Sequence, residues 1–308
     1  MSRLYERNRD LSRPVERIEL RVEPEEEGRL DQFLASKLKW RSRTGARKLV
    51  EQGCVSVNGD GRKASTKLRA GDVVVIEIER DHEGPEPPPP PIDVLYEDEH
   101  LMALNKASGT VVHPVGVHQR GTLLQELHRR TPEGPRPKLA HRLDQFTSGV
   151  LLVAKTDAVR TAFSDMLERG EVRKVYQALL MGRADWDEIE ARFPIAPVGD
   201  SRILMCIDAD RGKEAHSHFK AREKLRHATH AEIEIFTGRT HQIRIHASHL
   251  GHPLIGDHLY GDGIPVAGYE RFVLHAWRTR FKHPVTGAAM ELEAPRPAAF
   301  DAALALLR

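Results

Sequence analysis

The stretch KLAHRLDQFTSGVLLVAK, residues 138–155, contains the feature that decides the fold prediction. Its apolar run, residues 150–154, is bounded by turn-forming residues and is too short for a helix, so it predicts a buried strand. Just before this run, Arg142 and Asp144 lie two residues apart in a short polar turn. A single carboxylate on a turn against a buried strand is a rigid way to present a reactive group. An exposed Arg–Asp pair without a function is the common alternative for an isolated R-x-D.

Length and composition predict a folded cytoplasmic protein of about two domains. The chain has 308 residues, of which 40% are hydrophobic and 30% are charged. No apolar run approaches the roughly 18 residues of a membrane span, and the first residues lack the apolar segment of a secretory signal. The two cysteines, Cys54 and Cys206, are far apart, which argues for a reducing compartment rather than a disulfide framework. We therefore expect a cytoplasmic location and no membrane partner.

A small αα-ββ domain is predicted over residues 15–80. An alternating strand is expected at 18–22, followed by a helix from Arg29 whose apolar residues recur at spacings of three and four. A second helix is expected to start at an N-cap, Ser42, and to end at Gly53. Two short strands follow at 55–57 and 73–78.

This first domain is strongly basic. Residues 29–72 carry eleven Lys and Arg against four Asp and Glu, a net charge of +7, whereas the whole chain has +2. Arg43 and Arg47 are four residues apart and so share one helix face. A cationic face on a compact domain attracts phosphates, which predicts RNA binding through these two arginines. A solvated basic surface without a partner is the alternative.

The clearest domain boundary is residues 81–91, which hold six of the 19 prolines and predict a semi-rigid extended linker. The remainder, 92–308, alternates strand-like runs with a few helices. Several strands follow one another with no helix between them, which predicts an α+β domain with a mixed, mainly antiparallel sheet. Strands are expected at 92–96, 101–105, 175–181, 231–237, 272–276 and 290–293, and helices at 123–127, 157–169 and 300–307, with Asp157 near the cap of the second helix.

Two further segments could carry chemistry. Tyr176 lies on a predicted strand, where a tyrosine is ordinarily a packing residue. The segment TGRTHQIRIH, residues 237–246, is unusually polar for a segment that follows a strand, so its side chains are either solvated or converge on a ligand. His246, His249 and His252 are three residues apart, but without HExxH or CxxC a metal site is disfavoured and hydrogen-bonding histidines are expected instead. The chain also has no GxGxxG or Walker A loop, which disfavours nucleotide cofactors.

Taken in order, NKASGTVVHP, HRLDQFTSGVLLVAK, RKVYQAL, TGRTHQIRIHASHLGHPLIGDHLYG and LHAWRTRFKHPVTG resemble the RluA/RluD-type pseudouridine synthases over residues 92–298. The basic segment 28–79 resembles the alpha-L RNA-binding motif first seen in a small-subunit ribosomal protein, an arrangement found in the ribosomal large-subunit members. One departure is Ala107, where the family usually has proline. The resemblance implies the pseudouridine synthase fold, a monomer, and isomerisation of uridine within RNA. Because that reaction has no net redox change and adds no group, it implies no cofactor.

The resemblance also implies roles for particular residues. Asp144 corresponds to the family's catalytic acid, Arg244 to its partner as a bidentate fork, and Tyr176 to the tyrosine that stacks on the target base. Arg142 corresponds to the residue that fills the space left by the extruded nucleotide. In the polar segment, Arg239, His241 and Gln242 are expected to contact the substrate RNA.

Three rival interpretations remain open at this point. The first is a non-catalytic RNA-binding assembly factor, although Asp144, Tyr176 and Arg244 are all present. The second is a metal-dependent hydrolase built on the histidine-rich segment. The third keeps the chemistry but changes the target from large-subunit ribosomal RNA to transfer RNA. The basic first domain favours ribosomal RNA.

Overall fold

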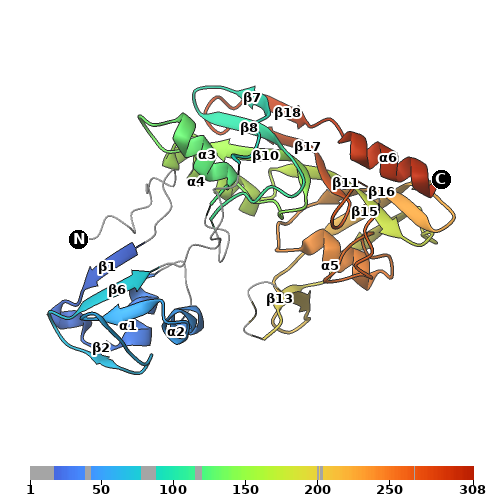
Figure 1. Ribbon diagram of the computed structural model, residues 1–308. Helices are drawn as coiled ribbons and strands as arrows, with labels where there is room; N and C mark the ends of the chain where they lie inside the picture. The colour runs from blue at the N-terminus through green and yellow to red at the C-terminus, as the bar shows by residue number, and fades with distance from the viewer. Residues whose placement is uncertain are drawn as a thin grey trace. The chain divides into compact units, whose positions relative to one another are not determined.

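The structure is a computed structural model that describes residues 17–38, 43–77, 88–114, 120–199, 201, 204–266 and 268–308 (Figure 1). Two compact units make up the chain. The first holds the residues up to Pro88 together with 114–121 and 127–136, and the second holds the rest. Two predictions fall wholly or largely outside the described residues, namely the N-cap at Ser42 and most of the proline-rich linker.

The first unit is a small sheet with two helices. Its elements are β1 (Arg17–Arg21), the 3-10 helix η2 (Pro24–Glu26), β2 (Gly28–Arg29), α1 (Leu30–Lys37), α2 (Arg43–Glu51), β3 (Val55–Val57), β4 (Asp60–Gly61), β5 (Lys67–Leu68) and β6 (Val73–Glu77). The strands β1, β6, β3 and β4 form one antiparallel sheet in that order. Apolar residues of both helices, including Phe33, Leu34 and Leu49, are buried with the alternate residues of β1 and β6. The predicted helices and strands of this unit are therefore present.

The second unit is built on one large sheet. Its elements are β7 (Val94–Glu97), β8 (Leu101–Lys106), α3 (Leu123–Arg130), β9 (Lys138–Leu139), β10 (Ser148–Ala154), α4 (Asp157–Glu168), β11 (Arg173–Met181), β12 (Glu188–Ala191), β13 (Ile195–Pro197), β14 (Met205–Ile207), β15 (Ser217–Lys224), β16 (Ala228–Ile235), α5 (Gln242–His249), β17 (Leu274–Lys282), β18 (Ala289–Glu293) and α6 (Ala298–Leu307). The main path of the sheet is β12-β15-β16-β11-β17-β10-β8-β7, with β18 beside β17 and β9 beside β10. Among the described residues, the strand pairings of this sheet are antiparallel except β10 with β17, so the predicted mixed, mainly antiparallel α+β fold is confirmed.

The apolar run of the opening stretch is the central strand β10, and all seven of its residues are buried. Val150 and Leu152 pack on one face with Phe163 of α4, while Leu151 and Val153 are fully buried on the other. Thr156 caps α4, because its side chain accepts a hydrogen bond from the Val159 N–H, and Asp157 follows directly, near the cap as predicted.

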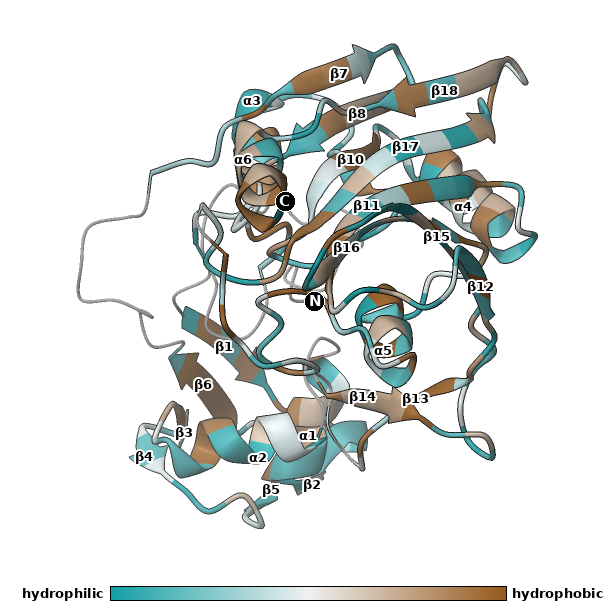
Figure 2. Cartoon of the chain, turned by 90° about the vertical axis from the view of Figure 1, so that its right-hand side faces the viewer, coloured by the Kyte–Doolittle hydropathy of each residue, from teal (hydrophilic) through white to brown (hydrophobic). Residues whose placement is uncertain are grey.

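The helix α5 lies on the concave side of the sheet, where β11, β16, β15 and β12 curve around it (Figure 2). Its residues 242–247 are all buried, although three of them are polar. This helix was not predicted from the sequence, because the segment lacks the apolar stripe that marks a helix. In the described part of the chain, no helix is long and apolar enough to cross a membrane.

Gly149 lies at the start of β10, directly after the polar turn. A substitution at this position tests how closely β10 pairs with its two neighbouring strands. Gly149 pairs with Lys106 of β8 and Ala276 of β17, and its φ is +105°. A Cβ at this position would lie 2.1 Å from the carbonyl oxygen of Ala276. We therefore expect Gly149→Ala to lower the free energy of unfolding by about 2–5 kcal/mol, from backbone strain together with overpacking. Urea unfolding measures this change.

Gly170→Ala is the matched control, because Gly170 also has a positive φ of +71° but has open space at its Cβ position. It is expected to lose only about 1 kcal/mol. Equal losses in the two variants would contradict the close β10–β17 contact.

Candidate active site

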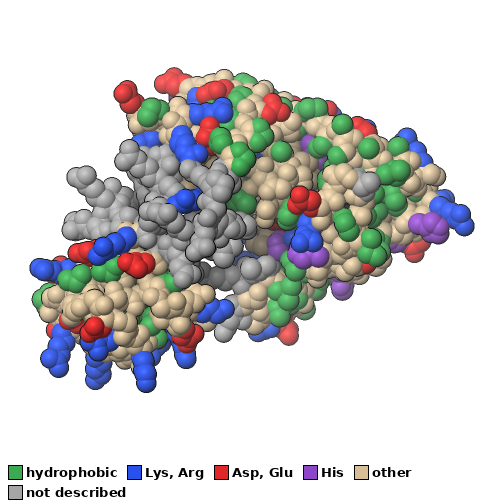
Figure 3. All heavy atoms as spheres, viewed as in Figure 1, with side chains coloured by type: hydrophobic (Ala, Val, Ile, Leu, Met, Phe, Trp, Pro, Cys, Tyr) green, Lys and Arg blue, Asp and Glu red, His purple; other side chains and the backbone are tan. Residues whose placement is uncertain are grey.

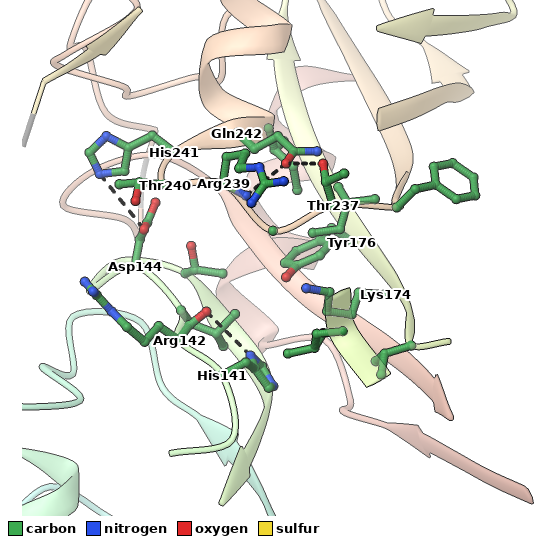
Figure 4. Close-up of a pocket in the computed structure, with 18 of the residues that line it drawn as sticks. His141, Arg142, Asp144, Lys174, Tyr176, Thr237, Arg239, Thr240, His241 and Gln242 are labelled. Atoms are coloured by element: carbon green, nitrogen blue, oxygen red, sulfur yellow. Dashed lines mark hydrogen bonds and ion pairs between the residues drawn. The ribbon is translucent and has the colours of Figure 1, made fainter. Parts of the chain in front are cut away.

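A cavity of about 650 Å³ lies in the second unit (Figure 4). It is lined by the turn before β10, by β11, and by the segment that leads from β16 into α5. These are the segments that the sequence analysis singled out, and they come together here from distant parts of the chain. Of the predicted site residues, Asp144, Tyr176, Arg244, Arg142, Arg239, His241 and Gln242 all line this cavity.

The turn that carries Asp144 is fixed by hydrogen bonds to the loop after β8. The buried ammonium of Lys106 donates to the carbonyl of Gln145 at 2.7 Å and to that of Ala107 at 2.9 Å. The backbone N–H of Gly109 donates to the carbonyl of Gln145, and the side-chain amide of Gln145 donates to the carbonyl of Gly109. The turn therefore has little freedom, even though Ala107 stands where the related family usually has proline.

Lys106 is a site residue that the sequence analysis missed. Burial lowers its pKa to about 7, although the negative charge of Asp144 acts in the opposite direction. The side chain is only 2% exposed. Lys106 therefore stabilises the turn that carries Asp144. The signal in the sequence that could have identified it is a lysine directly after a predicted buried strand.

Arg244 forms its bidentate fork with Asp257 and not, as predicted, with Asp144. Its Nε and Nη2 donate to the two carboxylate oxygens of Asp257 at 2.6 and 2.7 Å, whereas its Nη1 lies 3.5 Å from Oδ2 of Asp144. Both members of the fork are almost completely buried. Burial alone would raise the pKa of Asp257, but the hydrogen bonds and positive charge of Arg244 hold it below its usual value.

Aromatic rings and backbone groups complete the surroundings of this fork. The guanidinium carbon of Arg244 lies 4.3 Å from the ring centroid of Phe272 and 5.0 Å from that of Tyr260. Oδ1 of Asp257 also accepts the backbone N–H groups of Leu259 and Tyr260. The guanidinium is thereby held in one position, with one nitrogen left to face Asp144.

Tyr176 lies on β11 at the point where the pairing with β17 is irregular. Val175 pairs with Arg278 but Tyr176 pairs with Ala276, which leaves Trp277 as an extra residue opposite them. Such a bulge reorients nearby side chains. Burial raises the pKa of Tyr176, and the charge of Asp144 adds to this effect, so the phenol stays neutral at ordinary pH.

The polar segment before α5 places its side chains in different ways. Gln242 is 3% exposed and uses both amide hydrogens and both lone pairs within the protein, bonding His216, Ser217, Thr237 and the Arg239 N–H. Its predicted contact with RNA therefore has no free hydrogen-bonding group to make it. The side chain of Arg239 is exposed, and its Nε donates a hydrogen bond to the carbonyl of Glu214.

His241 has a left-handed backbone, with a φ of +57°, which is an uncommon and strained conformation for a residue with a side chain. Its Nδ1 lies 2.9 Å from the hydroxyl of Tyr260, and its Nε2 lies 4.0 Å from Oδ1 of Asp144. Burial lowers its pKa, which favours the neutral imidazole, while Asp144 acts in the opposite direction. The strained backbone aims a ring nitrogen at the carboxylate.

Arg142 is exposed and lines the cavity (Figure 4). Its neighbour His141 accepts a hydrogen bond from the Leu152 N–H through Nε2 at 3.1 Å, so this imidazole is neutral and fixed. Arg142 therefore extends from an anchored backbone, which suits a side chain that occupies space beside a substrate.

Arg43 and Arg47 lie in the first unit, on whose surface Lys and Arg side chains gather (Figure 3). They are not equivalent. Arg43 pairs with the buried carboxylate of Asp31 at 3.1 Å, whereas Arg47 is 64% exposed and pairs with the exposed Glu51. The shared helix face is present, but Arg43 is committed to the unit's own structure.

The histidine-rich segment is used for internal hydrogen bonding. His246 bonds Ser217 through Nδ1 and the carbonyl of Phe193 through Nε2, and His252 bonds the carbonyl of Met181. Within the described ranges, no group of three or more His, Cys, Asp or Glu residues could hold a metal ion.

The chemistry available in the cavity is that of a carboxylate held in place without a metal ligand set among the described residues. Asp144 is 29% exposed, so it is accessible from the cavity, and Arg244 faces it. Such a carboxylate can act as a nucleophile or as a base. A neutral tyrosine and an exposed arginine in the same cavity suit a flat base and its phosphate.

Comparison with known proteins identifies the class. A family model described as RNA pseudouridylate synthase matches residues 100–249, and an S4 domain model matches residues 28–74. A "Ribosomal large subunit pseudouridine synthase D" of Pseudomonas aeruginosa is 36% identical over 91% of this chain and 92% of its own length. An "Uncharacterized RNA pseudouridine synthase YlyB" of Bacillus subtilis is 36% identical over 89% and 92%. The solved "Human RNA Pseudouridylate Synthase Domain Containing 1" matches with a TM-score of 0.56 and 28% identity, covering 71% of this chain and 90% of that one.

The chain belongs to the RNA pseudouridylate synthase family, and it carries an S4 domain ahead of the catalytic region. It is an RNA pseudouridine synthase, an enzyme that isomerises uridine in RNA. The resemblance seen in the sequence is thereby confirmed.

The fork between Arg244 and Asp257 yields a stability prediction. Asp257→Asn leaves a buried guanidinium with only part of its counter-charge, so we expect the free energy of unfolding at pH 7 to fall by about 3–5 kcal/mol. Because the folded-state pKa of Asp257 is lowered, its contribution is complete above the unfolded-state value of about 3.9 and is lost as the pH falls further. The difference between wild type and Asp257→Asn should therefore shrink below about pH 4.

Asp301→Asn is the matched control, because Asp301 forms an exposed pair with Arg296 at 2.6 Å. We expect it to change the stability by less than about 1 kcal/mol. Similar losses at the two positions, measured by urea unfolding across pH, would show that burial of the fork is unimportant.

Proposed function

We propose that this enzyme forms pseudouridine at specific uridines of large-subunit ribosomal RNA, with Asp144 as the catalytic carboxylate. The observation that carries the proposal is the cavity in which Asp144 faces the fixed guanidinium of Arg244 at 3.5 Å. The ribosomal target is supported by the name of the Pseudomonas aeruginosa relative and by the basic S4 domain. Transfer RNA is the alternative target that the experiment must separate.

The roles of the cavity residues follow from their positions. Asp144 acts on the nucleotide as nucleophile or base, and the fixed guanidinium of Arg244 orients it. Tyr176 offers a neutral ring on which the target base stacks. Arg142, exposed at the cavity, occupies the space that the extruded nucleotide leaves, which offsets part of the unstacking cost of a few kcal/mol.

Two members of the polar segment receive revised roles in this proposal. Gln242 positions the segment rather than contacting RNA, because its hydrogen-bonding groups are all used within the protein. His241 faces Asp144 and Tyr260 and helps to place the carboxylate. Arg239 remains available to a phosphate through its exposed side chain.

The rearrangement needs no cofactor, since every atom of the product comes from the substrate. We further propose that one chain is sufficient and acts in the cytoplasm. The support for a single chain is that one unit of one chain supplies all of the cavity lining.

Mapping of pseudouridines tests the function and the target together. Cells with and without the gene are compared by chemical-adduct reverse-transcription stops in ribosomal and transfer RNA. We expect a few stops to be lost from large-subunit RNA, to return with wild type, and not to return with Asp144→Asn. In vitro, the single-turnover rate of that variant should be at least about 10³-fold lower than that of wild type, since a side-chain amide is neither a nucleophile nor a base at neutral pH.

Asp165→Asn, at an exposed position of α4, is the control and should restore every stop. Stops lost from transfer RNA alone would replace the proposed target while keeping the chemistry. Pseudouridine formation by Asp144→Asn would refute the assignment of the catalytic carboxylate.

The two arginines of the S4 domain give a second test. Arg47→Gln removes an exposed charge, so the slope of log affinity against log salt for a structured fragment of large-subunit RNA should fall in magnitude by about 1. Its stability should be unchanged. Arg43→Gln should instead lower the free energy of unfolding by about 1–3 kcal/mol, because the buried Asp31 loses a partner. An unchanged salt slope for Arg47→Gln would exclude this residue from the RNA contact.

A further inference from the structure

Lys174 is a buried cation without a counter-charge among the described residues. It lies on β11 two residues before Tyr176, so both side chains leave the strand on the same face and line the cavity (Figure 4). Lys174 is 7% exposed, and its ammonium has no hydrogen bond or ion pair in the described part of the chain. Burial lowers its pKa to about 8, and no carboxylate opposes that effect.

The neighbours of Lys174 leave its ammonium free rather than neutralised. A Cβ on Gly238 would lie 3.3 Å from Nζ, so the absence of a side chain there keeps the space around the ammonium open. The pKa of His141 is lowered to about 3 by burial and by the charge of Lys174, so this imidazole stays neutral. Neither neighbour offers negative charge.

The second buried lysine of this region shows the contrast. Lys106 is bonded to two backbone carbonyls and lies in the field of Asp144. It therefore has partners that explain its burial, whereas Lys174 has none among the described residues. Burying an ammonium without partners is unfavourable, and this cost is recovered when an anion or a strong acceptor enters.

The position of Lys174 relative to Asp144 indicates which acceptor that is. Figure 4 shows the side chains of Lys174 and Tyr176 next to each other on β11, with Asp144 across the cavity from both. A base stacked on Tyr176, with its glycosidic bond toward Asp144, thus presents its far edge toward Lys174. In uracil the edge opposite N1 carries the O4 carbonyl oxygen, next to the N3–H group.

We propose that Lys174 donates a hydrogen bond to a carbonyl oxygen of the target uracil and stabilises the negative charge that the base acquires during the reaction. This inference rests on the proposed function and on Asp144 as the attacking carboxylate. When the C1′–N1 bond breaks, its electron pair stays with the uracil and is shared by N1 and the two carbonyl oxygens, while a carboxylate oxygen of Asp144 bonds to C1′. On rejoining, C5 bonds to C1′ and the carboxylate recovers its pair.

A proton then leaves C5 and N1 gains one, so that the atoms and electrons balance without any further reactant. Attack of Asp144 on C6 of the base would also move an electron pair onto a carbonyl oxygen. Negative charge on a carbonyl oxygen of the uracil, which Lys174 would stabilise, thus develops in both routes. A fixed, buried cation at such an oxygen stabilises the transition state more than the ground state.

Single-turnover pseudouridine formation by Lys174→Met tests the inference, with wild type assayed on the same ribosomal and transfer RNA. We expect a rate about 10²–10³-fold lower, with RNA affinity changed by less than about threefold. The urea midpoint should be equal to or above that of wild type, since an uncompensated buried charge has been removed. A structural lysine would give the opposite result, with stability lost and the rate on folded protein kept.

Chemical rescue makes the test specific for the ammonium group. Lys174→Ala removes three carbons and the nitrogen, which propylammonium can replace in the cavity. We expect propylammonium to raise the rate of Lys174→Ala at least tenfold, and neither 1-propanol nor sodium chloride at the same concentration to do so. Lys155→Ala, which removes an ammonium paired with Glu97 outside the cavity, should keep the wild-type rate.

The outcomes separate the two hypotheses. If wild type forms pseudouridine and Lys174→Met stays within about threefold of it, the role of Lys174 is wrong while the function stands. Loss of stability in Lys174→Met, or rescue by 1-propanol as effective as by propylammonium, also overturns it. If wild type forms no pseudouridine in either RNA, the proposed function fails, and an unfolding midpoint of Lys174→Met below that of wild type would then reject the uncompensated charge as well.

Discussion

The buried fork between Arg244 and Asp257 is the interaction on which the cavity depends. The two residues are 13 positions apart, and their two hydrogen bonds tie the interior of α5 to the turn that follows it. A buried ion pair of this kind adds little net stability over well-packed apolar residues, because both charges are desolvated. Its value here is geometric. It holds the guanidinium so that the remaining nitrogen faces Asp144, which comes from a turn 100 residues earlier in the chain.

The topology of the sheet explains how these distant residues meet. The strand β17 lies between β10 and β11 and pairs with both, in parallel with the first and antiparallel with the second. The turn that enters β10 and the face of β11 that carries Tyr176 therefore lie on either side of one central strand. The bulge in β17 falls opposite Tyr176, and Gly149 lies at the entry to β10. Two irregular positions of the sheet thus lie in strands next to the cavity, and other register shifts lie away from it, in β15 and β7.

The sequence was sufficient for the parts of the fold that follow regular patterns. The apolar run of β10, the strand of Tyr176 and the two helices of the first unit follow periods that sequence shows directly. The helix α5 does not, because Gln242, Arg244 and His246 are buried through hydrogen bonds rather than through apolar character. The bidentate partner of Arg244 was predicted to be Asp144, but it is Asp257. Either carboxylate is compatible with the sequence, and only the three-dimensional path of the chain selects between them.

The cations of this enzyme fall into two groups that differ in their response to solvent. Exposed residues of the S4 domain, such as Arg47, interact through water, where salt screens a charge beyond about 8 Å at physiological ionic strength. Lys174 and Arg244 act inside a cavity, where screening is weak and each charge has a fixed direction. Arg244 has its acids already in place, whereas Lys174 has no partner in the described structure until a substrate arrives. RNA capture should therefore depend on salt, while the chemical step on bound RNA depends on the two buried cations and should be nearly independent of salt.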